Sequence, residues 1–413
     1  TGSGGMSKPK VFEKPVGVRD YLPHAVAKLR RIELSALDCM RRWGYEQIIT
    51  PTLEYYDTVG AASTTSDRKL FKLLDPRGTT IVLRSEMTAP IARVVASLLR
   101  QAPLPLRLSY HANVFRAFDE GAGRDAEFFQ TGAELVGDDS AEADAEIIAL
   151  AASALQAAGV PSFSIAFGHV GFLNGLLEEK LPGRRDKQDL LKDCLLQRDF
   201  VGYRDRLREL ALDGEDRRAL EEVLDLRGGR EVCDRALKLG QSGEVRAAIR
   251  QLGEIWDVLG AYGVQHLVSV DLTMIGDFSY YTGMIFEGYA SQLGFPVCSG
   301  GRYDNLLAQF GRPAPATGFA LKTTRILDVI NGQADEEERV LILYAPRALS
   351  EALAEASRLR ESGRTVVTAS LRGEADWAEA EKLAAAGGDK PLEYRGRTFD
   401  RLVVIGRREE EAR

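Results

Sequence analysis

The sequence predicts an α+β fold in which helices flank a mostly antiparallel sheet, followed by a smaller α/β domain. Three observations lead to this prediction. Strand patterns occur in two separated regions, before about residue 168 and after about residue 266. Between them, residues 183–262 are charged, amphipathic and helical, as expected of an insertion. Beyond the acidic linker at 331–338, strands alternate with helices, which is typical of a parallel sheet.

The elements before the insertion follow from apolar spacing and turn chemistry. Apolar residues at helical spacing predict a helix over 24–43, which Gly44 ends, and the segment YEQIIT predicts a strand after it. The turn sequence DPRG lies between LFKLL and TTIVLR and predicts a hairpin. The remaining expected elements are a helix at 87–100, a hairpin made by LRLSYHANVFR and AEFFQTGAELVG, a helix at 140–158 and the strand SFSIAFG.

The elements after the insertion complete the main domain. HLVSVDLTM, FSYYTGMIFEGY and CSGGRYD read as strands, and we expect a helix after Gly318. The predicted organisation is a main domain at 6–330, the linker 331–338 and a small α/β domain at 339–413. Residues 1–5, TGSGG, resemble a cloning remnant.

Composition excludes several classes of protein. The hydrophobic content of 45% is ample for a core, and no apolar run approaches the roughly 18 residues of a membrane span. The formal net charge of −7 argues against a nucleic-acid surface. The four cysteines are scattered without a CxxC pair, which fits a reducing compartment. We therefore expect a cytoplasmic protein without membrane or nucleic-acid partners.

Common catalytic and metal-binding patterns are missing. The sequence contains no GxxxxGK[ST], HExxH or GxSxG motif. The four histidines are isolated from one another, so we expect no metal site. The segment GAGRD at 121–125 would fit a phosphate loop or a plain hairpin loop, and the hairpin loop is the favoured interpretation.

A series of motifs resembles the class II aminoacyl-tRNA synthetases, and histidyl-tRNA synthetase in particular. The matching segments run in family order from about residue 16 to 330. They are GVRDYLP with GYEQIITPTLE for the first motif, LRSEMTAPIAR, FRAFDEGAGRDAEFFQTGAE for the second motif, YYTGMIFE, SGGRYDNL and GFALKTTR for the third motif. The resemblance implies the synthetase fold, and the first motif implies a dimer.

The resemblance also implies a pocket for histidine. The positions that match it are Glu86, Thr88, Arg116, Gln130, Glu134, Tyr280 and Tyr281. Carboxylates suit an ammonium and an imidazole N–H, an arginine suits a carboxylate, and phenols can close the wall. Our hypothesis is that Arg116 holds the ligand carboxylate and Glu134 senses the imidazole.

Adenylation needs cations that this sequence lacks. Gly276 stands where the synthetases keep a histidine-specific catalytic arginine, and the loss of such a contact costs about 3 kcal/mol. Phe118 and Asp119 replace the glutamate and arginine that follow in the second motif. Arg124 and Arg325 remain as a vestigial nucleotide site. The resemblance therefore implies a retained pocket, no catalytic residues and no cofactor.

The same departures characterise the regulatory subunits of ATP phosphoribosyltransferase, relatives of the synthetase in histidine biosynthesis. Residues 339–413 are also short and nearly neutral, unlike a tRNA-reading domain. This resemblance implies a non-catalytic partner that activates the short-form catalytic subunit and mediates feedback inhibition by free histidine.

Two other interpretations remain open from the sequence: a divergent histidyl-tRNA synthetase, and a histidine-binding protein serving an unrelated partner. The sequence leaves open whether regulatory histidine binds in the cleft or at a subunit interface. It also leaves open the docking face, the stoichiometry, the role of the insertion and residual ATP binding.

Overall fold

The computed structural model describes residues 13–63, 65–117, 125–276, 280–330, 338–385 and 391–406. The chain divides into two compact units, residues 1–331 and 332–413. The second-motif positions Phe118, Asp119 and Arg124, together with most of the GAGRD segment and of the acidic linker, lie outside the described residues.

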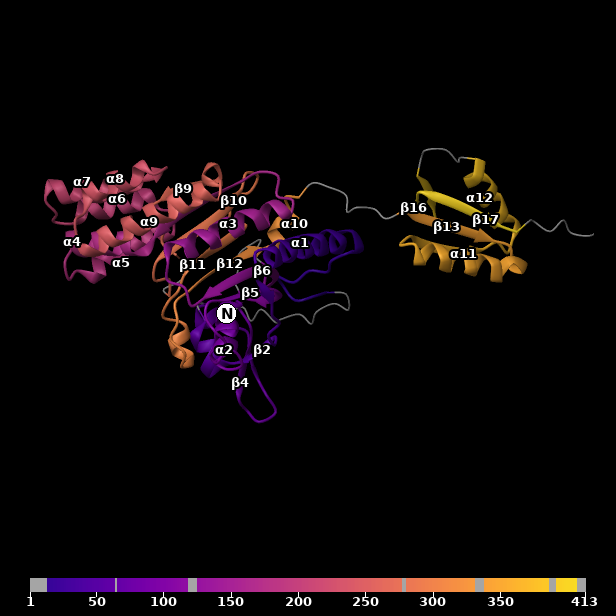
Figure 1. Cartoon of the computed structure of the whole chain (residues 1–413), viewed down its shortest axis with the longest axis horizontal. Helices are drawn as coiled ribbons and strands as arrows, with labels where there is room; N and C mark the ends of the chain where they lie inside the picture. Colours follow the sequence, from indigo (N-terminus) through magenta and orange to yellow (C-terminus); the bar gives the residue numbers. More distant parts are fainter. Residues whose placement is uncertain are drawn as a thin grey trace, which may run out of the picture. The chain divides into compact units, whose positions relative to one another are not determined.

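The first unit is built on one mixed sheet (Figure 1). Among the described residues its strands join in the order β1-β5-β6-β12-β11-β10-β7-β9-β8. All neighbours run antiparallel except β1 with β5 and β7 with β9. The predicted α+β fold with a mostly antiparallel sheet is therefore confirmed. The strand bounds are β1 Glu46–Gln47, β5 Leu106–Phe115, β6 Glu127–Val136, β7 Phe163–His169, β8 Arg227–Gly228, β9 Val268–Asp271, β10 Met284–Ala290, β11 Cys298–Arg302 and β12 Ala316–Lys322.

Helices cover both faces of this sheet. One face packs against α1 Pro23–Arg42, α3 Ala141–Ala157 and the short α10 Thr323–Leu327 in a single large core. The other face carries α2 Thr88–Ala96 over β5, with Met87, Ile91 and Val95 buried against it. Because α2 covers only one end of that second face, the remainder of the face is available for a ligand.

The insertion is a group of helices at the β7-β9-β8 end of the sheet (Figure 1). The helices begin earlier than predicted, because the side chain of His169 accepts a hydrogen bond from the Gly171 amide and caps α4 directly after β7. The two-residue strand β8 interrupts the helical stretch. The helix bounds are α4 Val170–Lys180, α5 Arg185–Leu196, α6 Phe200–Glu209, α7 Gly214–Glu222, α8 Glu231–Leu239 and α9 Gly243–Ala261.

A small antiparallel sheet precedes α2, in the order β2-β4-β3. It contains the hairpin that the DPRG turn predicts, with Asp75 accepting hydrogen bonds from the amides of Arg77 and Thr79. The strands are β2 Leu53–Tyr55, β3 Lys72–Leu74 and β4 Thr80–Leu83.

The structure corrects two predictions in the first unit. Helix α2 ends at Ala96 rather than near residue 100. The guanidinium of Arg312 donates hydrogen bonds to the carbonyl oxygens of Val95, Leu99 and Ala102 at 2.8–3.0 Å, so these carbonyls are bonded outside the helix. Gly318 itself lies inside β12, which runs on to Lys322, so the predicted helix after Gly318 begins only at Thr323, as α10.

The second unit is a parallel three-stranded sheet in the order β14-β13-β17. Its central strand is buried on both faces, as expected for a parallel sheet between helices. The predicted alternation of strands and helices is present, and the hairpin β15-β16 was not predicted. The bounds are β13 Arg339–Tyr344, α11 Leu349–Glu361, β14 Thr365–Ser370, α12 Glu374–Ala385, β15 Leu392–Tyr394, β16 Arg397–Phe399 and β17 Arg401–Ile405.

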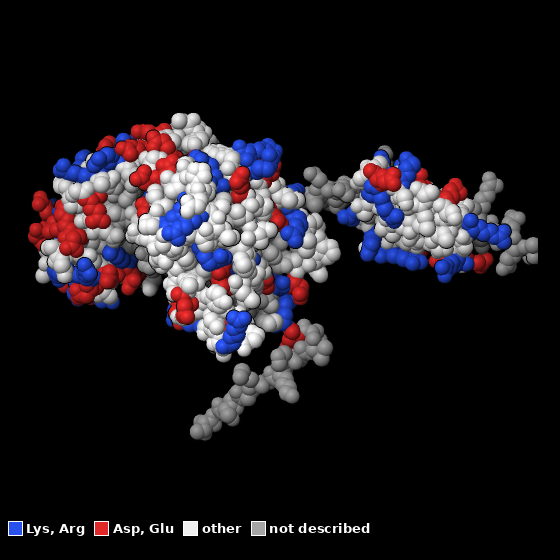
Figure 2. Space-filling view, turned by 60° about the horizontal axis from the view of Figure 1, so that its bottom comes forward, with Lys and Arg blue, Asp and Glu red and all other residues white. Residues whose placement is uncertain are grey.

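The surface carries charges of both signs. On the face drawn in Figure 2, acidic and basic side chains of the described residues are interspersed over each unit. No helix within the described ranges is both long and apolar enough to cross a membrane.

Candidate functional site

The floor of the candidate site is the face of the large sheet that α2 leaves open. Strand register places Glu134 beside Gly318, and Gln130 beside Lys322, on β6 and β12. On the same face, Gly132 and Ala320 lie between these two pairs. Because side chains alternate along a strand, all of these residues share one face, and the floor is low in the middle with polar groups at both ends.

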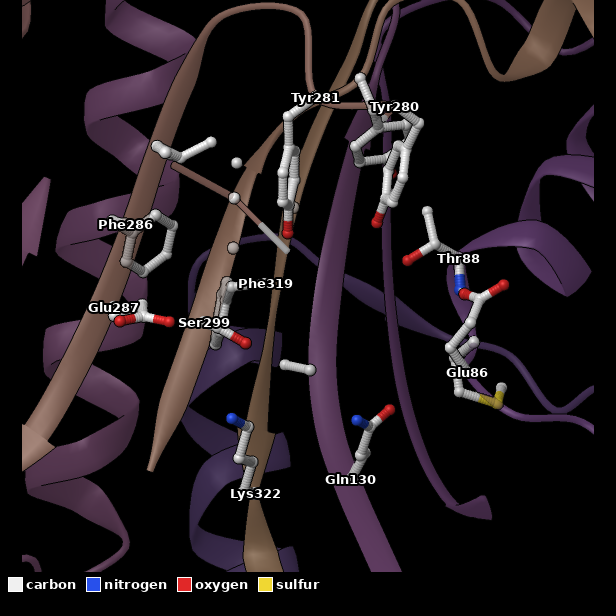
Figure 3. A pocket seen from close by; sticks show the side chains of 18 of the residues that line it. Glu86, Thr88, Gln130, Tyr280, Tyr281, Phe286, Glu287, Ser299, Phe319 and Lys322 are labelled. Atoms are coloured by element: carbon white, nitrogen blue, oxygen red, sulfur yellow. The ribbon is translucent and has the colours of Figure 1, made fainter. Parts of the chain in front are cut away.

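A cavity of about 490 Å³ lies above this floor. All seven predicted pocket residues line it, among others. Figure 3 shows Tyr280 and Tyr281 at one end of the cavity, with Gln130 and Lys322 at the other. The structure thus brings the predicted residues together from the start of α2 and the turn before it, from β6, from the loop after β5 and from the segment before β10.

Glu134 lies at the tyrosine end and is almost fully buried. Its carboxyl accepts a hydrogen bond from the Tyr303 hydroxyl and another from Thr88 Oγ1 at 3.0 Å. Burial raises the pKa of Glu134 to about 8, with a smaller contribution from the negative charge of Glu86, while the two hydroxyls oppose the shift. Near neutral pH this carboxyl can therefore hold or release a proton, which suits an imidazole partner.

Gly318 makes room for that carboxyl. A Cβ atom at position 318 would lie 1.7 Å from Oε2 of Glu134 and 2.6 Å from the backbone oxygen of Ala133. The close approach of β12 to Glu134 therefore requires glycine at this position.

Glu86 lines the cavity and also holds the start of α2. Its carboxylate accepts the backbone N–H groups of Thr88 at 2.5 Å and of Ala89 at 3.1 Å. Burial raises the pKa of Glu86, and those amides together with the positive charge of Arg116 oppose the shift. Part of the bonding capacity of Glu86 is thus used in capping the helix.

Three tyrosines form the wall above Glu134. The rings of Tyr280 and Tyr281 stack with centroids 4.8 Å apart, and Tyr280 meets Tyr303 edge to face at 5.6 Å. Tyr303 was not predicted as a site residue, although it belongs to the SGGRYDNL segment. Its hydrogen bond to Glu134 could be found only from the fold, since Glu134 lies on β6 and Tyr303 lies directly after β11.

The two described arginines of the predicted site also line the cavity. Arg116 donates from Nε to the Ser85 carbonyl at 2.8 Å, and its guanidinium lies 5.3 Å from the centroid of Phe128. Arg325 donates to the Pro296 carbonyl at 2.8 Å and lies 4.7 Å from the centroid of Phe295. These contacts fix both cations beside the floor.

Lys322 is a cation of the site that the sequence analysis missed. It lies at the end of β12, and burial lowers its pKa to about 8, with the charges of Arg325 and Arg116 acting in the same direction. The alternation of Gly318, Ala320 and Lys322 with Phe319 and Leu321 is the signal that could have placed it on the floor. The prediction of a helix after Gly318 obscured that alternation.

Gly276 is packed against the tyrosine wall. A Cβ atom at position 276 would lie 2.5 Å from Cδ2 of Tyr281. An arginine at this position would therefore require the ring of Tyr281 to move. The wall as packed in this chain therefore leaves no room for a larger side chain at position 276.

The arrangement can bind a polar ligand that has hydrogen-bond donors at one end and an anion at the other. Glu134, Glu86 and Thr88 supply acceptors near the tyrosines, whereas Lys322, Arg116 and Arg325 supply positive charge. Among the described residues, no group of three His, Cys, Asp or Glu side chains is arranged to hold a metal ion.

Comparisons with known proteins give a consistent result. A family model described as histidyl-tRNA synthetase matches residues 17–326. The ATP phosphoribosyltransferase regulatory subunit of Halalkalibacterium halodurans is 44% identical over 373 residues, covering 90% of this chain and 94% of the relative. The protein of the same name from Bacillus subtilis is 44% identical over 363 residues, covering 88% and 93%.

Two solved structures show how far the fold is shared. An ATP phosphoribosyltransferase regulatory subunit/histidyl-tRNA synthetase from Bacillus halodurans superposes with a TM-score of 0.86 at 40% identity, covering 97% of this chain and 100% of the other. Histidyl-tRNA synthetase from Nostoc sp. PCC 7120 superposes with a TM-score of 0.74 at 21% identity, covering 91% and 90%. The second likeness bears on the fold alone.

Proposed function

The chain belongs to the histidyl-tRNA synthetase family and, within it, to the regulatory subunits of ATP phosphoribosyltransferase, and from this premise we propose that it regulates the first step of histidine biosynthesis without catalysing a reaction itself. The regulated complex condenses ATP with phosphoribosyl pyrophosphate. In this proposal the chain docks to a short-form catalytic subunit, activates it, and makes it responsive to free histidine.

One observation carries the proposal. The cavity combines acceptors suited to an imidazole and an ammonium with Gly276 at the position of the synthetase's catalytic arginine, and Tyr281 occupies the space a side chain there would need. Such a site can bind an amino acid while lacking a cation that stabilises the adenylation transition state. Binding without activation is what a sensor needs.

We place the regulatory histidine in this cavity rather than at a subunit interface. The imidazole lies against Glu134, within reach of the Thr88 hydroxyl, and the carboxylate lies toward Arg116. Support comes from the pKa of Glu134, about 8, which lets the carboxyl exchange a proton with an imidazole near neutral pH.

Feedback requires that histidine bind the inhibited arrangement of the complex more tightly than the active one. A tenfold inhibitory effect needs about 1.4 kcal/mol of differential affinity. The hydrogen bonds of one buried carboxyl are sufficient for a difference of that size.

We also propose that the chain self-associates through its first-motif region. Ile49, Leu53 and Tyr55 are apolar or aromatic and are 85%, 48% and 57% exposed. An exposed apolar group of this kind supports an interface between two copies.

The placement of histidine is tested by calorimetry on Glu134→Ala. We expect the variant to lose at least about tenfold in histidine affinity, because a buried acceptor for the imidazole is gone. Glu254→Ala, on the exposed face of α9, serves as the matched control. Unchanged affinity in Glu134→Ala would reject this placement.

A divergent histidyl-tRNA synthetase is the second candidate, because Arg116 and Arg325 both still line the cavity. Histidine-dependent exchange of pyrophosphate into ATP separates the two functions. Our proposal expects no exchange above background, and exchange that requires Arg325 would favour the synthetase.

A further inference from the structure

The cavity has an electrostatic polarity that runs along two paired strands. Glu134 and Gly318 face each other at one end, and Gln130 and Lys322 face each other four residues away. Four residues of a strand span about 13 Å between Cα atoms. The Tyr110 ring covers Gly132, since a Cβ atom there would lie 2.5 Å from the Tyr110 hydroxyl, so the open part of the floor lies above Ala320. Both long side chains can lean toward this part, and a small ligand there can contact a carboxyl and an ammonium at once.

Lys322 is not neutralised by its neighbours. The carboxylate of Glu287, on β10, is the negative charge that favours the charged form of Lys322, and it is itself engaged by the Tyr289 hydroxyl and by Arg198 at 3.3 Å. Among the described residues, the side chain of Lys322 forms no ion pair or hydrogen bond, whereas its backbone N–H donates to the Val297 carbonyl at 2.7 Å. Arg116 and Arg325 lie near enough to repel it. A largely buried ammonium in such surroundings is stabilised by an anion from outside the chain.

The separation of a carboxyl and an ammonium along the floor also limits which chemical groups a ligand must carry. A molecule that uses both ends must carry hydrogen-bond donors for Glu134 and an anionic group for Lys322, which describes a zwitterionic amino acid. The side-chain amide of Gln130, directly across the strand pair from Lys322, can donate to the same anionic group.

We propose that Lys322 binds the carboxylate of the amino acid whose side chain lies on Glu134, and that it replaces the cation absent at Gly276. This assignment rests on the proposed histidine-binding function and makes it more specific. Lys322 approaches from the floor of the sheet, whereas a residue at 276 would approach from the tyrosine wall. Arg116 then supplies a second contact to the carboxylate, not the principal one.

The test compares two ligands in two proteins by isothermal titration calorimetry. L-histidine and L-histidinol differ only in the carboxylate, which is a hydroxymethyl group in histidinol. We expect the unmodified protein to prefer histidine by about tenfold to a hundredfold, the range expected of one charge-assisted contact. In Lys322→Met that preference should fall to about twofold or less, while histidinol affinity stays unchanged.

Controls separate a specific contact from a general effect. Lys322→Arg keeps the charge and should restore part of the preference. Lys187→Met removes a positive charge from the exposed surface of α5 and should leave the preference intact. Retained histidinol binding shows that Lys322→Met is folded.

Three outcomes would overturn the inference. A preference for histidine that survives in Lys322→Met means that another group holds the carboxylate. Equal loss of both ligands means that Lys322 only supports the fold, and inorganic phosphate that competes with histidinol in a Lys322-dependent manner would reassign the site to phosphate. If the unmodified protein binds neither ligand, the proposed function fails as well, which is distinguishable from failure of the Lys322 contact alone.

Discussion

Glu134 shows how burial and hydrogen bonding set the chemistry of one side chain. The carboxyl is removed from water, and the hydroxyls of Tyr303 and Thr88 only partly replace the lost solvation. The result is a group that changes charge near physiological pH, unlike an exposed glutamate. This property makes Glu134 suited to an imidazole, whose own pKa lies in the same region.

The raised pKa of Glu134 predicts how stability depends on pH. Between pH 4.5 and about 8, the folded protein holds a proton on Glu134 that the unfolded chain has released. The free energy of unfolding should therefore fall as pH rises through this window, by up to a few kcal/mol. In Glu134→Gln this contribution is absent. Urea unfolding of the ligand-free proteins from pH 5 to 9 should therefore show the free energy of unfolding of the variant rising relative to that of the unmodified protein.

Glu254→Gln, on the exposed surface of α9, provides the control for this pH comparison. If the stability curves of Glu134→Gln and the unmodified protein run parallel across the window, the buried carboxyl does not titrate as described.

At the residue scale, sequence reasoning placed the acceptors of the site more reliably than its cations. Glu86, Thr88 and Glu134 lie within contiguous motifs and line one cavity. Lys322 and Tyr303 were missed because their importance depends on which strands are neighbours. Arg124 lies outside the described residues, so its role stays a prediction.

At the scale of elements, β12 is the part that shapes the floor. Its alternation of small residues with Phe319 and Leu321 packs one face into the core and leaves the other face low enough for a ligand. Strand pairing on both sides fixes its register, so the position of Lys322 relative to Glu134 follows from the sheet.

Gly318→Ala tests this account of the floor. The added methyl group would collide with the carboxyl of Glu134 and with the backbone of β6, so we expect a loss of about 1–3 kcal/mol in stability and a loss of histidine binding. Urea unfolding and calorimetry measure the two effects. The matched control is Gly294→Ala, where a Cβ atom meets no described heavy atom within 4 Å. Equal behaviour of the two variants would contradict the close packing described.

Local sequence patterns were sufficient to predict most helices and strands. They failed where residues distant in sequence determine where an element begins or ends. The hairpins of β3-β4 and β5-β6 follow from turn chemistry and alternation, and α1 and α3 follow from apolar spacing. The end of α2 depends on Arg312, more than 200 residues away in sequence, which no local pattern indicates. The strand that contains Gly318 pairs with β11, which is near it in sequence, and with β6, which lies far earlier in the chain, so its register also depends on a distant partner.

At the scale of the whole molecule, regulation requires that the ligand site bias the arrangement of the complex. The floor of the cavity reaches the helical insertion through Glu287, which accepts a hydrogen bond from Arg198 between α5 and α6. That contact joins the ligand-binding face to a surface outside the sheet.

The central claim, that this chain activates a catalytic partner and makes it sensitive to histidine, is tested most directly by the rate of phosphoribosyl-ATP formation. A short-form catalytic subunit is assayed with and without this protein across a titration of histidine. The account predicts that the protein raises the rate, that histidine reverses the increase, and that Glu134→Ala still activates but responds weakly to histidine. A rate that the protein does not change at any histidine concentration would contradict the regulatory role.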